Sequence, residues 1–439
     1  MMKNIIFASR SYDRKGKVYE AIEHHNAGLD PELMAEKFQR MKASPYAFFR
    51  GSNHLFWSDF AGDWRLHAFG GSAFSRTWLE GDAHVYNMGA YLNNAGNVAF
   101  GFDDYDDSLV ADYQYDLWRF ATSIVLDAWQ NNRFDLPQVS DVVRAFAKRY
   151  LKTMASFEQV DLVSCSFDKS NTCKSLARFL KQTEKKYSRR RMLDKWTVVG
   201  ADSRRRFREV EGKLALVPGD CRDALSRAYQ QYLETIPKAL SAGSGWSDQV
   251  LDVAERLGAG TGSLGFKRYY LLISGQTDQA FDDIILDVKQ QNQPTAFAYL
   301  SDEERREYDY NFENHAQRHA EAYRALSEFP DPHLGWLAMD DTWFSVRERS
   351  PFKNDFPTAD LTTSKGYRRM AKQWADIIAT KHLRAARRLN KDIDPRVFES
   401  TMNRILRDRE QEFSAFVDAI ALAYARQVRM DWMLFREGF

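Results

Sequence analysis

Strand-like segments are confined to two regions of this chain, and that distribution limits the folds open to it. One apolar run covers residues 97–102, after the turn-forming Asn93-Asn94-Ala95-Gly96. A second group lies between residues 249 and 346, with strands expected at 249–256, 268–273, 284–288 and 343–346. Elsewhere the apolar residues recur at helical spacing. Because the strands are grouped and do not alternate with helices, the pattern predicts a mostly helical α+β protein with a small antiparallel sheet.

The helices are marked by capping residues and by apolar spacing. Asp30 is a suitable N-cap and Pro31 a suitable first helical residue, and Phe38 and Met41 continue one apolar face. Further helices are expected at residues 115–131, 139–157, 174–188, 222–240, 302–329, 365–390 and 395–435. The glycine- and serine-rich stretch 241–246 is the expected linker. We therefore expect a helical region at 1–245, a sheet region at 246–350 and C-terminal helices at 351–439.

Composition excludes several classes of function. The 62 Lys and Arg residues nearly balance the 61 Asp and Glu residues, so the net charge of +1 predicts no binding to nucleic acid or to a membrane surface. The N-terminal apolar run is too short for a signal peptide, and no stretch approaches the ~18 apolar residues of a membrane span. The only cysteines, Cys165, Cys173 and Cys221, form no zinc or disulfide pattern. We expect a cytoplasmic protein.

The densest group of chemically useful side chains lies in residues 78–107. Asp82 and Asn87 are five residues apart, and Asp104 and Asp106 follow the apolar run at 97–102. Phosphoryl transfer needs a carboxylate to position or deprotonate the attacking hydroxyl, and oxygen ligands for Mg²⁺. Taken together, these residues supply a carboxylate and oxygen ligands in the order in which a kinase uses them.

A glycine-rich segment at residues 258–265 lies between two expected strands. Gly260, Gly262 and Gly265 fit the pattern G-x-G-x-x-G, with Ser263 among them. A loop between two strands can cover nucleotide phosphates with its backbone N–H groups, whereas a dinucleotide fold would need a strand followed by a helix. Lys289 ends the next strand and could reach the phosphates. An ordinary hairpin turn and an exposed lysine are the alternatives.

Several segments resemble one bacterial family, the domain of unknown function 2252. The resemblance covers most of the chain, in the segments 42–51, 81–87, 102–108, 115–120, 253–265, 287–289 and 344–347. That family resembles kinase-like proteins, especially aminoglycoside and choline phosphotransferases, whose catalytic loop has the pattern His-Gly-Asp-x-His-x-x-Asn. Here Glu80 replaces the first histidine, and Tyr105 replaces the phenylalanine of the family's aspartate motif. The loop of Asp82 also precedes the glycine loop in the chain.

The resemblance therefore implies a two-lobed kinase-like fold with circularly permuted lobe order, which uses ATP and Mg²⁺ to phosphorylate an unidentified hydroxyl acceptor. It implies that Asp82 is the catalytic base, and that His84 orients the loop or touches a phosphate, or is simply structural. Asp116 would be a structural aspartate. The implied metal ligands are Asn87, Asp104 and Asp106, and the implied phosphate-binding residues are Gly260, Gly262, Ser263, Gly265 and Lys289.

Other assignments stay open at this level. Either Glu313 or Glu321 could pair with Lys289, and His382 resembles part of the family's C-terminal segment. Three basic residues in family-like segments could hold anionic groups or form ion pairs between helices: Arg50, Arg347 and Lys353. The alternative functions are a non-catalytic nucleotide-binding module, nucleotidyl transfer, and an all-helical prenyl-transfer enzyme that uses the aspartates at 103–107 as a diphosphate-metal motif.

Overall fold

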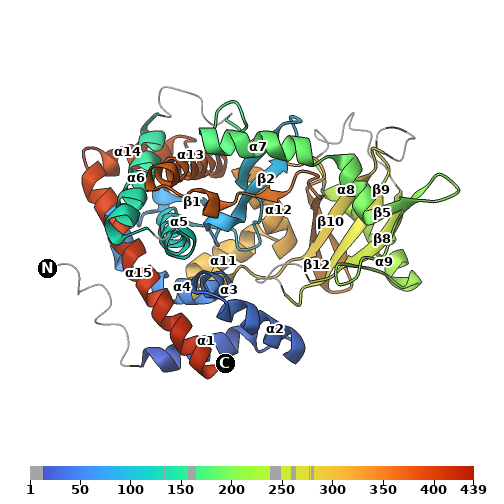
Figure 1. Cartoon of the computed structure of the whole chain (residues 1–439), viewed down its shortest axis with the longest axis horizontal. Coiled ribbons are helices and arrows are strands. Elements are labelled where there is room, and N and C mark those ends of the chain that lie inside the picture. Colours follow the sequence, from blue (N-terminus) through green and yellow to red (C-terminus); the bar gives the residue numbers. More distant parts are fainter. Residues whose placement is uncertain are drawn as a thin grey trace.

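The computed structural model describes residues 13–132, 134–156, 165–237, 249–258, 264–275, 277 and 281–439. Helices gather on one side of the molecule and the largest sheet lies on the other (Figure 1), which confirms the predicted α+β, mainly helical character. The helices are α1 (Arg14–Asn26), α2 (Pro31–Lys42), α3 (Pro45–Gly51), α4 (Asn53–Phe60), α5 (Gln114–Asp127), α6 (Leu136–Ser156), α7 (Lys174–Lys186), α8 (Arg189–Trp196), α9 (Gly219–Thr235), α11 (Asp302–Asn311), α12 (His315–Leu326), α13 (Ser364–Leu389), α14 (Val397–Leu406) and α15 (Glu410–Gly438).

The largest sheet has six antiparallel strands in the order β11 (Gly335–Met339), β12 (Thr342–Glu348), β10 (Ile284–Gln290), β9 (Arg268–Ile273), β8 (Val250–Arg256) and β7 (Leu214–Leu216). Successive residues of β9 face opposite sides, as strand geometry requires. Tyr269 and Leu271 pack with α9, and Tyr270 and Leu272 pack with α8. Helices α8 and α9 and strand β7 all precede residue 246, the expected start of the sheet region. The sheet and the helices packed on it therefore include residues from before that expected start. The expected linker at 241–246 lies outside the described residues.

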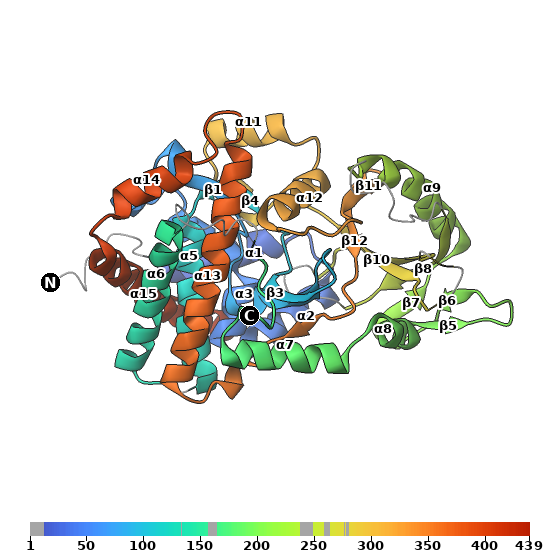
Figure 2. The ribbon, with the colours of Figure 1, turned by 90° about the horizontal axis from the view of Figure 1, so that it is seen from above.

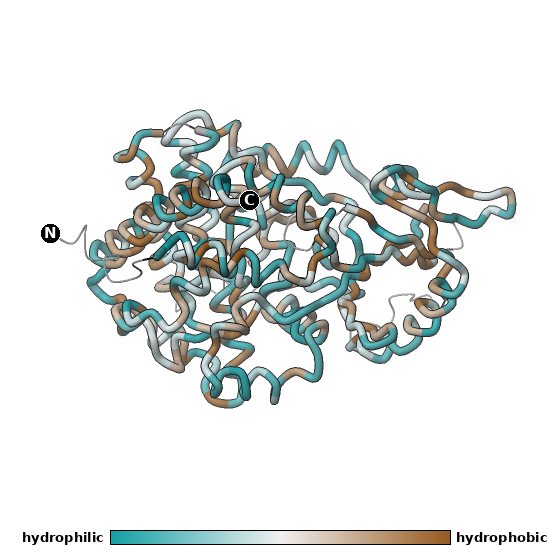
Figure 3. The backbone as a smooth tube through the Cα atoms, turned by 90° about the horizontal axis from the view of Figure 1, so that it is seen from below, coloured by the Kyte–Doolittle hydropathy of each residue, from teal (hydrophilic) through white to brown (hydrophobic). Residues whose placement is uncertain are grey.

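The helical body is built from helices that are distant in sequence. Helix α13 packs against α6, and α15 packs against α5 and α6, as Figure 2 shows from above. Phe120 of α5 stacks on Phe146 of α6 and contacts Trp374 of α13 edge to face. Brown and teal residues alternate along the helical coils in Figure 3, as expected for helices with one buried and one exposed face.

Two small sheets, of which only β3 was predicted, bring two loops together. Strand β1 (Arg76–Leu79) pairs with β4 (Leu109–Asp112), and β2 (Met88–Leu92) pairs with β3 (Val98–Phe102) and with β13 (Asn354–Asp355). A further short pair joins β5 (Thr197–Val199) to β6 (Arg205–Phe207). Leu79 at the end of β1 lies opposite Leu109 at the start of β4. The loop after β1 (80–87) and the loop before β4 (103–108) therefore leave the pair at the same end.

Two predicted helices are each two helices. The segment 302–329 contains α11 and α12, because Asn314 caps a new helix by accepting a hydrogen bond from the backbone N–H of Gln317. The segment 395–435 contains α14 and α15, separated at Asp408, whose φ of 60° is not helical. Strand β11 was also missed. Within the described ranges, no helix is both long and apolar enough to cross a lipid bilayer.

Candidate functional site

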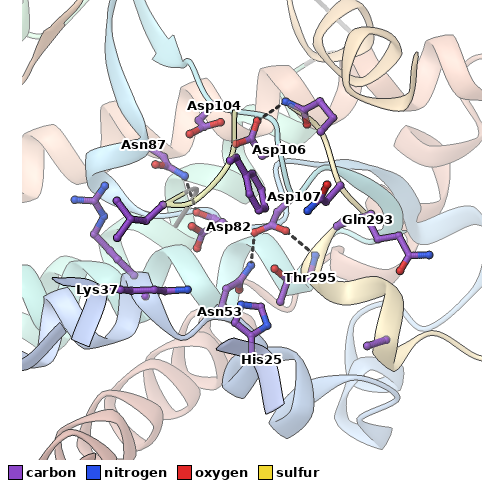
Figure 4. Close-up of a pocket in the computed structure, with 18 of the residues that line it drawn as sticks. His25, Lys37, Asn53, Asp82, Asn87, Asp104, Asp106, Asp107, Gln293 and Thr295 are labelled. Carbon is purple, nitrogen blue, oxygen red and sulfur yellow. Dashed lines mark hydrogen bonds between the residues drawn. The ribbon is translucent and has the colours of Figure 1, made fainter. Parts of the chain in front are cut away.

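Two cavities meet beside the loops at 80–87 and 103–108. The first, of about 480 Å³, lies between these loops, α2 and the segment 291–298, and Figure 4 shows its walls. The second, of about 780 Å³, lies beside β9, β10 and β12. Arg50, Asn87 and Asp104 line both cavities. These three residues therefore stand where the two spaces join.

The loop at 80–87 is held by its backbone. Gly81 has a φ of 85°, and a Cβ atom there would lie 1.9 Å from the carbonyl oxygen of Asp107. The carboxylate of Asp116 accepts hydrogen bonds from the backbone N–H groups of Glu80 and Gly81, at 2.8 and 3.0 Å. His382 Nε2 lies 3.2 Å from the same carboxylate. The residue predicted to be structural, Asp116, thus fixes the loop that carries Asp82.

Asp82 faces the first cavity and contacts a buried arginine. Arg119 of α5 donates from Nε to Asp82 Oδ1 at 2.7 Å, and a second guanidinium nitrogen contacts the same oxygen. Burial raises the pKa of Asp82 from 3.8 to about 7, against the opposing effect of the Arg119 charge. A carboxyl group with a pKa near neutrality can take up and release a proton under ordinary conditions.

His84 lies beside Asp82, as predicted. Its Nε2 is 3.7 Å from Asp82 Oδ2, and its Nδ1 has no hydrogen-bond partner within the described part of the chain. Burial lowers the pKa of His84 well below 6.5, and the charges of Arg50 and Arg119 act in the same direction. The imidazole is therefore neutral at ordinary pH.

Asn87 and Glu80 form a buried pair behind Asp82. Asn87 Nδ2 donates to Glu80 Oε1 at 2.7 Å and to the backbone oxygen of Asp82 at 3.0 Å. These bonds engage the amide nitrogen and leave the amide oxygen for a ligand. Burial and the neighbouring charges of Asp82 and Asp116 raise the pKa of Glu80 well above 4.5. These effects favour the protonated form of Glu80, against the opposing effect of the hydrogen bond from Asn87.

The predicted aspartates meet Lys289 at the junction of the cavities. Lys289 Nζ contacts Asp106 and lies 3.6 Å from Asp104 Oδ1. Gln291 Nε2 donates to Asp106 Oδ1 at 2.9 Å. Burial alone would raise the pKa of Asp104, but the Lys289, Lys353 and Arg347 charges outweigh it, so the pKa falls well below 3.8. Asp104 is therefore ionised.

The expected partners of Lys289 were wrong. Lys289 pairs with Asp106, while Glu321 pairs with Arg324 at 2.8 Å and Glu313 is exposed. Asp106 has a raised pKa, first because it is buried and then because Asp104 lies nearby. Lys289 therefore links the end of strand β10 to the loop at 103–108.

The glycine loop is described only at its ends. Gly260, Gly262 and Ser263 lie outside the described residues. Gly265 has a φ of 92°, which favours glycine, and a Cβ atom there would lie 2.9 Å from Leu29 Cδ2. Gly258 lines the second cavity and Leu264 the first. The two described ends of the loop therefore reach the two different cavities.

The second cavity is rich in cationic side chains. Arg268 pairs with Asp287, with Nε 2.6 Å from Oδ1, and Lys353 lies 2.9 Å from Asp103. Arg347 and Arg50 form no ion pair with any described residue. Eight arginine and lysine residues line the cavity with seven acids, and Arg50 and Arg347 are available to an anionic ligand.

Two further residues of the first cavity and its surroundings were not predicted. Arg119 lies in the middle of a buried helix. The apolar spacing of this helix marks the residues around Arg119 but gives no sign of a role for the arginine itself. Lys37 lies on α2, whose amphipathic pattern gives a lysine no special meaning, yet its side chain is buried and lines the cavity. The sequence signal that could have indicated Arg119 is its place in the family-like segment 115–120. The structure shows that this position is buried.

Comparison with known proteins identifies the family alone. Residues 29–438 match the family model described as "Uncharacterized protein conserved in bacteria (DUF2252)". Searches of curated proteins and of solved structures each found no match. The match covers nearly the whole chain and agrees with the resemblance noted in the sequence. The chain therefore belongs to the bacterial family known as the domain of unknown function 2252.

Proposed function

We propose that this protein is an ATP- and Mg²⁺-dependent phosphotransferase with a circularly permuted, kinase-like architecture. The observation that carries the proposal is the junction of the two cavities at Asn87 and Asp104. Asp82 faces only the first cavity, and Lys289 only the second. A nucleotide on one side and a hydroxyl acceptor on the other would meet at the metal-ligand residues.

The second cavity is the proposed nucleotide site. In protein kinases a glycine-rich loop covers the phosphates and the phosphate-binding lysine lies on the third strand of the small sheet. Here the glycine-containing connection joins β8 to β9, and Lys289 is the last residue but one of the neighbouring strand β10. Arg347 and Arg50 line this cavity and form no direct ion pair with a described residue. This order of loop, strand and lysine supports the assignment.

The oxygen donors at the junction suit Mg²⁺. Magnesium prefers carboxylate and amide oxygens, and it often retains water while it also binds substrate phosphates. Asp104 is ionised, and the amide oxygen of Asn87 is free of the contacts that engage its nitrogen. Both oxygens of Asp106 are already engaged, by Lys289 and Gln291. We therefore assign Asn87 and Asp104 as the main ligands, and Asp106 to the positioning of Lys289.

Asp82 is the proposed base. As the acceptor oxygen forms its bond to the transferred phosphorus, the hydroxyl proton passes to the Asp82 carboxylate, the bond to the leaving ADP oxygen breaks, and ADP takes the electron pair. Arg119 holds the carboxylate in place and favours its ionised form. Because phosphoryl transfer depends mainly on positioning and charge stabilisation, these contacts are what the reaction requires.

Calorimetric titration of the full chain with ATP, with and without Mg²⁺, tests the proposal. We expect binding that depends on Mg²⁺, and weaker binding in Asp104→Ala. Asp82→Asn should bind Mg-ATP with unchanged affinity. Asp392→Asn is an exposed control, and its affinity for Mg-ATP should also equal that of the wild type. Equal ATP affinity with and without metal, or no ATP binding at all, would overturn the proposal.

A binding module without catalysis is the second candidate. The ion pair between Arg119 and Asp82 favours it, because a paired carboxylate is a weaker base. This candidate would be supported if the wild-type chain binds ATP in a metal-dependent way but hydrolyses ATP no faster than Asp82→Asn does. The prenyl-transfer alternative has less support, because residues 103–107 form a loop and their carboxylates do not share a helix face.

A further inference from the structure

We propose that the first cavity binds an acceptor that carries an anionic phosphate or carboxylate group, with Lys37 as the residue that binds this group. The term acceptor rests on the proposed phosphotransferase function, but the anion site itself does not. Lys37 belongs to α2 and lies across the cavity from Asp104 and Asp106 (Figure 4).

Lys37 is a buried cation without a partner. Its exposed fraction is 4%, and it lines the first cavity. No described residue forms a hydrogen bond or an ion pair with its ammonium group, and Figure 4 shows this group directed into the cavity on the side of Asn53. Burial lowers the pKa of Lys37 from 10.5 to about 8, against the opposing effect of Asp107, so the group is still mainly charged at neutral pH. An unpaired buried charge is costly unless a ligand compensates it.

None of the acids that line the cavity makes an ion pair or a hydrogen bond with Lys37, although the charge of Asp107 acts on it from a greater distance. Asp82 pairs with Arg119, and Lys289 compensates Asp104 and Asp106. Asp107 accepts hydrogen bonds from Asn53 Nδ2 at 2.9 Å and from the backbone N–H of Thr295 at 2.6 Å. Burial favours the protonated form of Glu80. Because no described acid contacts the Lys37 ammonium group, this group can bind the phosphate or carboxylate of a ligand.

Several neutral groups also line the cavity near Lys37. His25 stacks on His54 with ring centroids 4.1 Å apart, and burial lowers the pKa of His25 to about 4. Asn53, Gln293 and Thr295 line the same space with amide and hydroxyl groups. These side chains can hydrogen-bond to hydroxyl groups. The ligand class that fits is a small hydroxylated molecule with one phosphate or carboxylate group.

Titration with inorganic phosphate and, separately, with acetate tests the anion site. The full chain is used both free and saturated with ADP and Mg²⁺, so that phosphate entering the second cavity is recognised by its loss when ADP is bound. We expect phosphate to bind to the ADP-saturated chain, and Lys37→Met to weaken that binding about tenfold or more. Methionine has a similar length and no charge, so it suits the buried position. Lys365→Met, on the exposed face of α13, should not change the affinity.

The outcomes separate the two proposals. Binding of phosphate alone supports a phosphorylated acceptor, and binding of both probes supports either oxyanion. Unchanged affinity in Lys37→Met, or no anion binding by the ADP-saturated wild-type chain, would overturn the inference. If the chain fails to bind ATP, the phosphotransferase proposal falls, while phosphate binding to the free chain that depends on Lys37 would still establish the anion site.

Discussion

Two opposing effects determine the pKa of Asp82, the proposed base. Burial favours the protonated carboxyl group, and the Arg119 guanidinium favours the ionised one. Arg50 also favours the ionised form, Asp107 opposes it, and His84 is neutral. The balance leaves the pKa at about 7. Turnover should therefore increase with pH through about 7, as Asp82 loses its proton.

Arg119→Gln should move this increase to higher pH. Removal of a contacting cation raises the pKa of the carboxyl group, by roughly 1–3 pH units for such a pair. The measurement is a pH–rate profile of ATP turnover, together with a melting curve to confirm folding. Arg206→Gln removes an arginine from an exposed ion pair with Asp202 and should leave the profile unchanged. A profile of Arg119→Gln that coincides with wild type would show that Asp82 does not control the rate.

Lys37 should reduce stability when no ligand is bound. Because its pKa falls from 10.5 to about 8 on folding, the folded chain binds fewer protons between these pH values. The penalty, about 3 kcal/mol, is fully present below pH 8 and disappears as pH increases to 10.5. Lys37→Met should thus increase the free energy of unfolding at pH 7, measured with urea, and this gain should vanish near pH 10.5. A loss of stability at pH 7 would contradict the unpaired charge.

Sequence reasoning located the acidic side chains of the site because carboxylates in a loop after a strand are recognisable as a pattern. It did not find Arg119 or Lys37, because an arginine within a buried helix and a lysine on an amphipathic helix have no pattern of their own. Their significance comes from what surrounds them in space. The partner of Lys289 was missed for the same reason: Asp106 reaches it only through the fold.

Among the elements, the loop after β1 depends on glycine most directly. Gly81→Ala would place a methyl group against the carbonyl of Asp107 in a backbone conformation that already disfavours alanine. We expect a loss of roughly 2–5 kcal/mol in the free energy of unfolding and a loss of turnover. Gly62→Ala is the matched control, because its φ is 67° but no atom lies within 4 Å of the new Cβ. Similar melting temperatures for the two variants would contradict the close packing of the two loops.

An element could be predicted when residues close to it in the sequence mark its ends or its type. Helix α2 was predicted because Asp30 and Pro31 mark its start locally. The strands β1 and β4 have four residues each and are largely buried, so no alternation of polar and apolar residues marks them. The division between α14 and α15 was missed because Asp408 adopts its left-handed conformation without a glycine or proline nearby.

At the scale of the whole molecule, the site exists only where the sheet meets the helical body. Arg318 of α12 is fully buried and donates to the backbone oxygens of Asp106 and Ser108, both at 2.7 Å. Lys289 reaches the same loop from β10. The sequence did not predict this contact surface, since these residues lie far apart in the chain. The α+β class could therefore be predicted, whereas the geometry of the junction could not.

Hydrogen exchange of the full chain tests this junction. ATP with Mg²⁺ should slow exchange in the loops at 80–87 and 103–108 and in β10 together, because a ligand at the junction would contact all three, while α15 should not change. Lys289→Met should weaken ATP binding about tenfold or more and reduce the protection in all three segments, because a charge-assisted contact to phosphate is lost. Lys267→Met, an exposed lysine just before β9, is the control and should behave as wild type. Protection confined to β10 would mean that the nucleotide binds the sheet without engaging Asp104, and the two parts would then not form one active site.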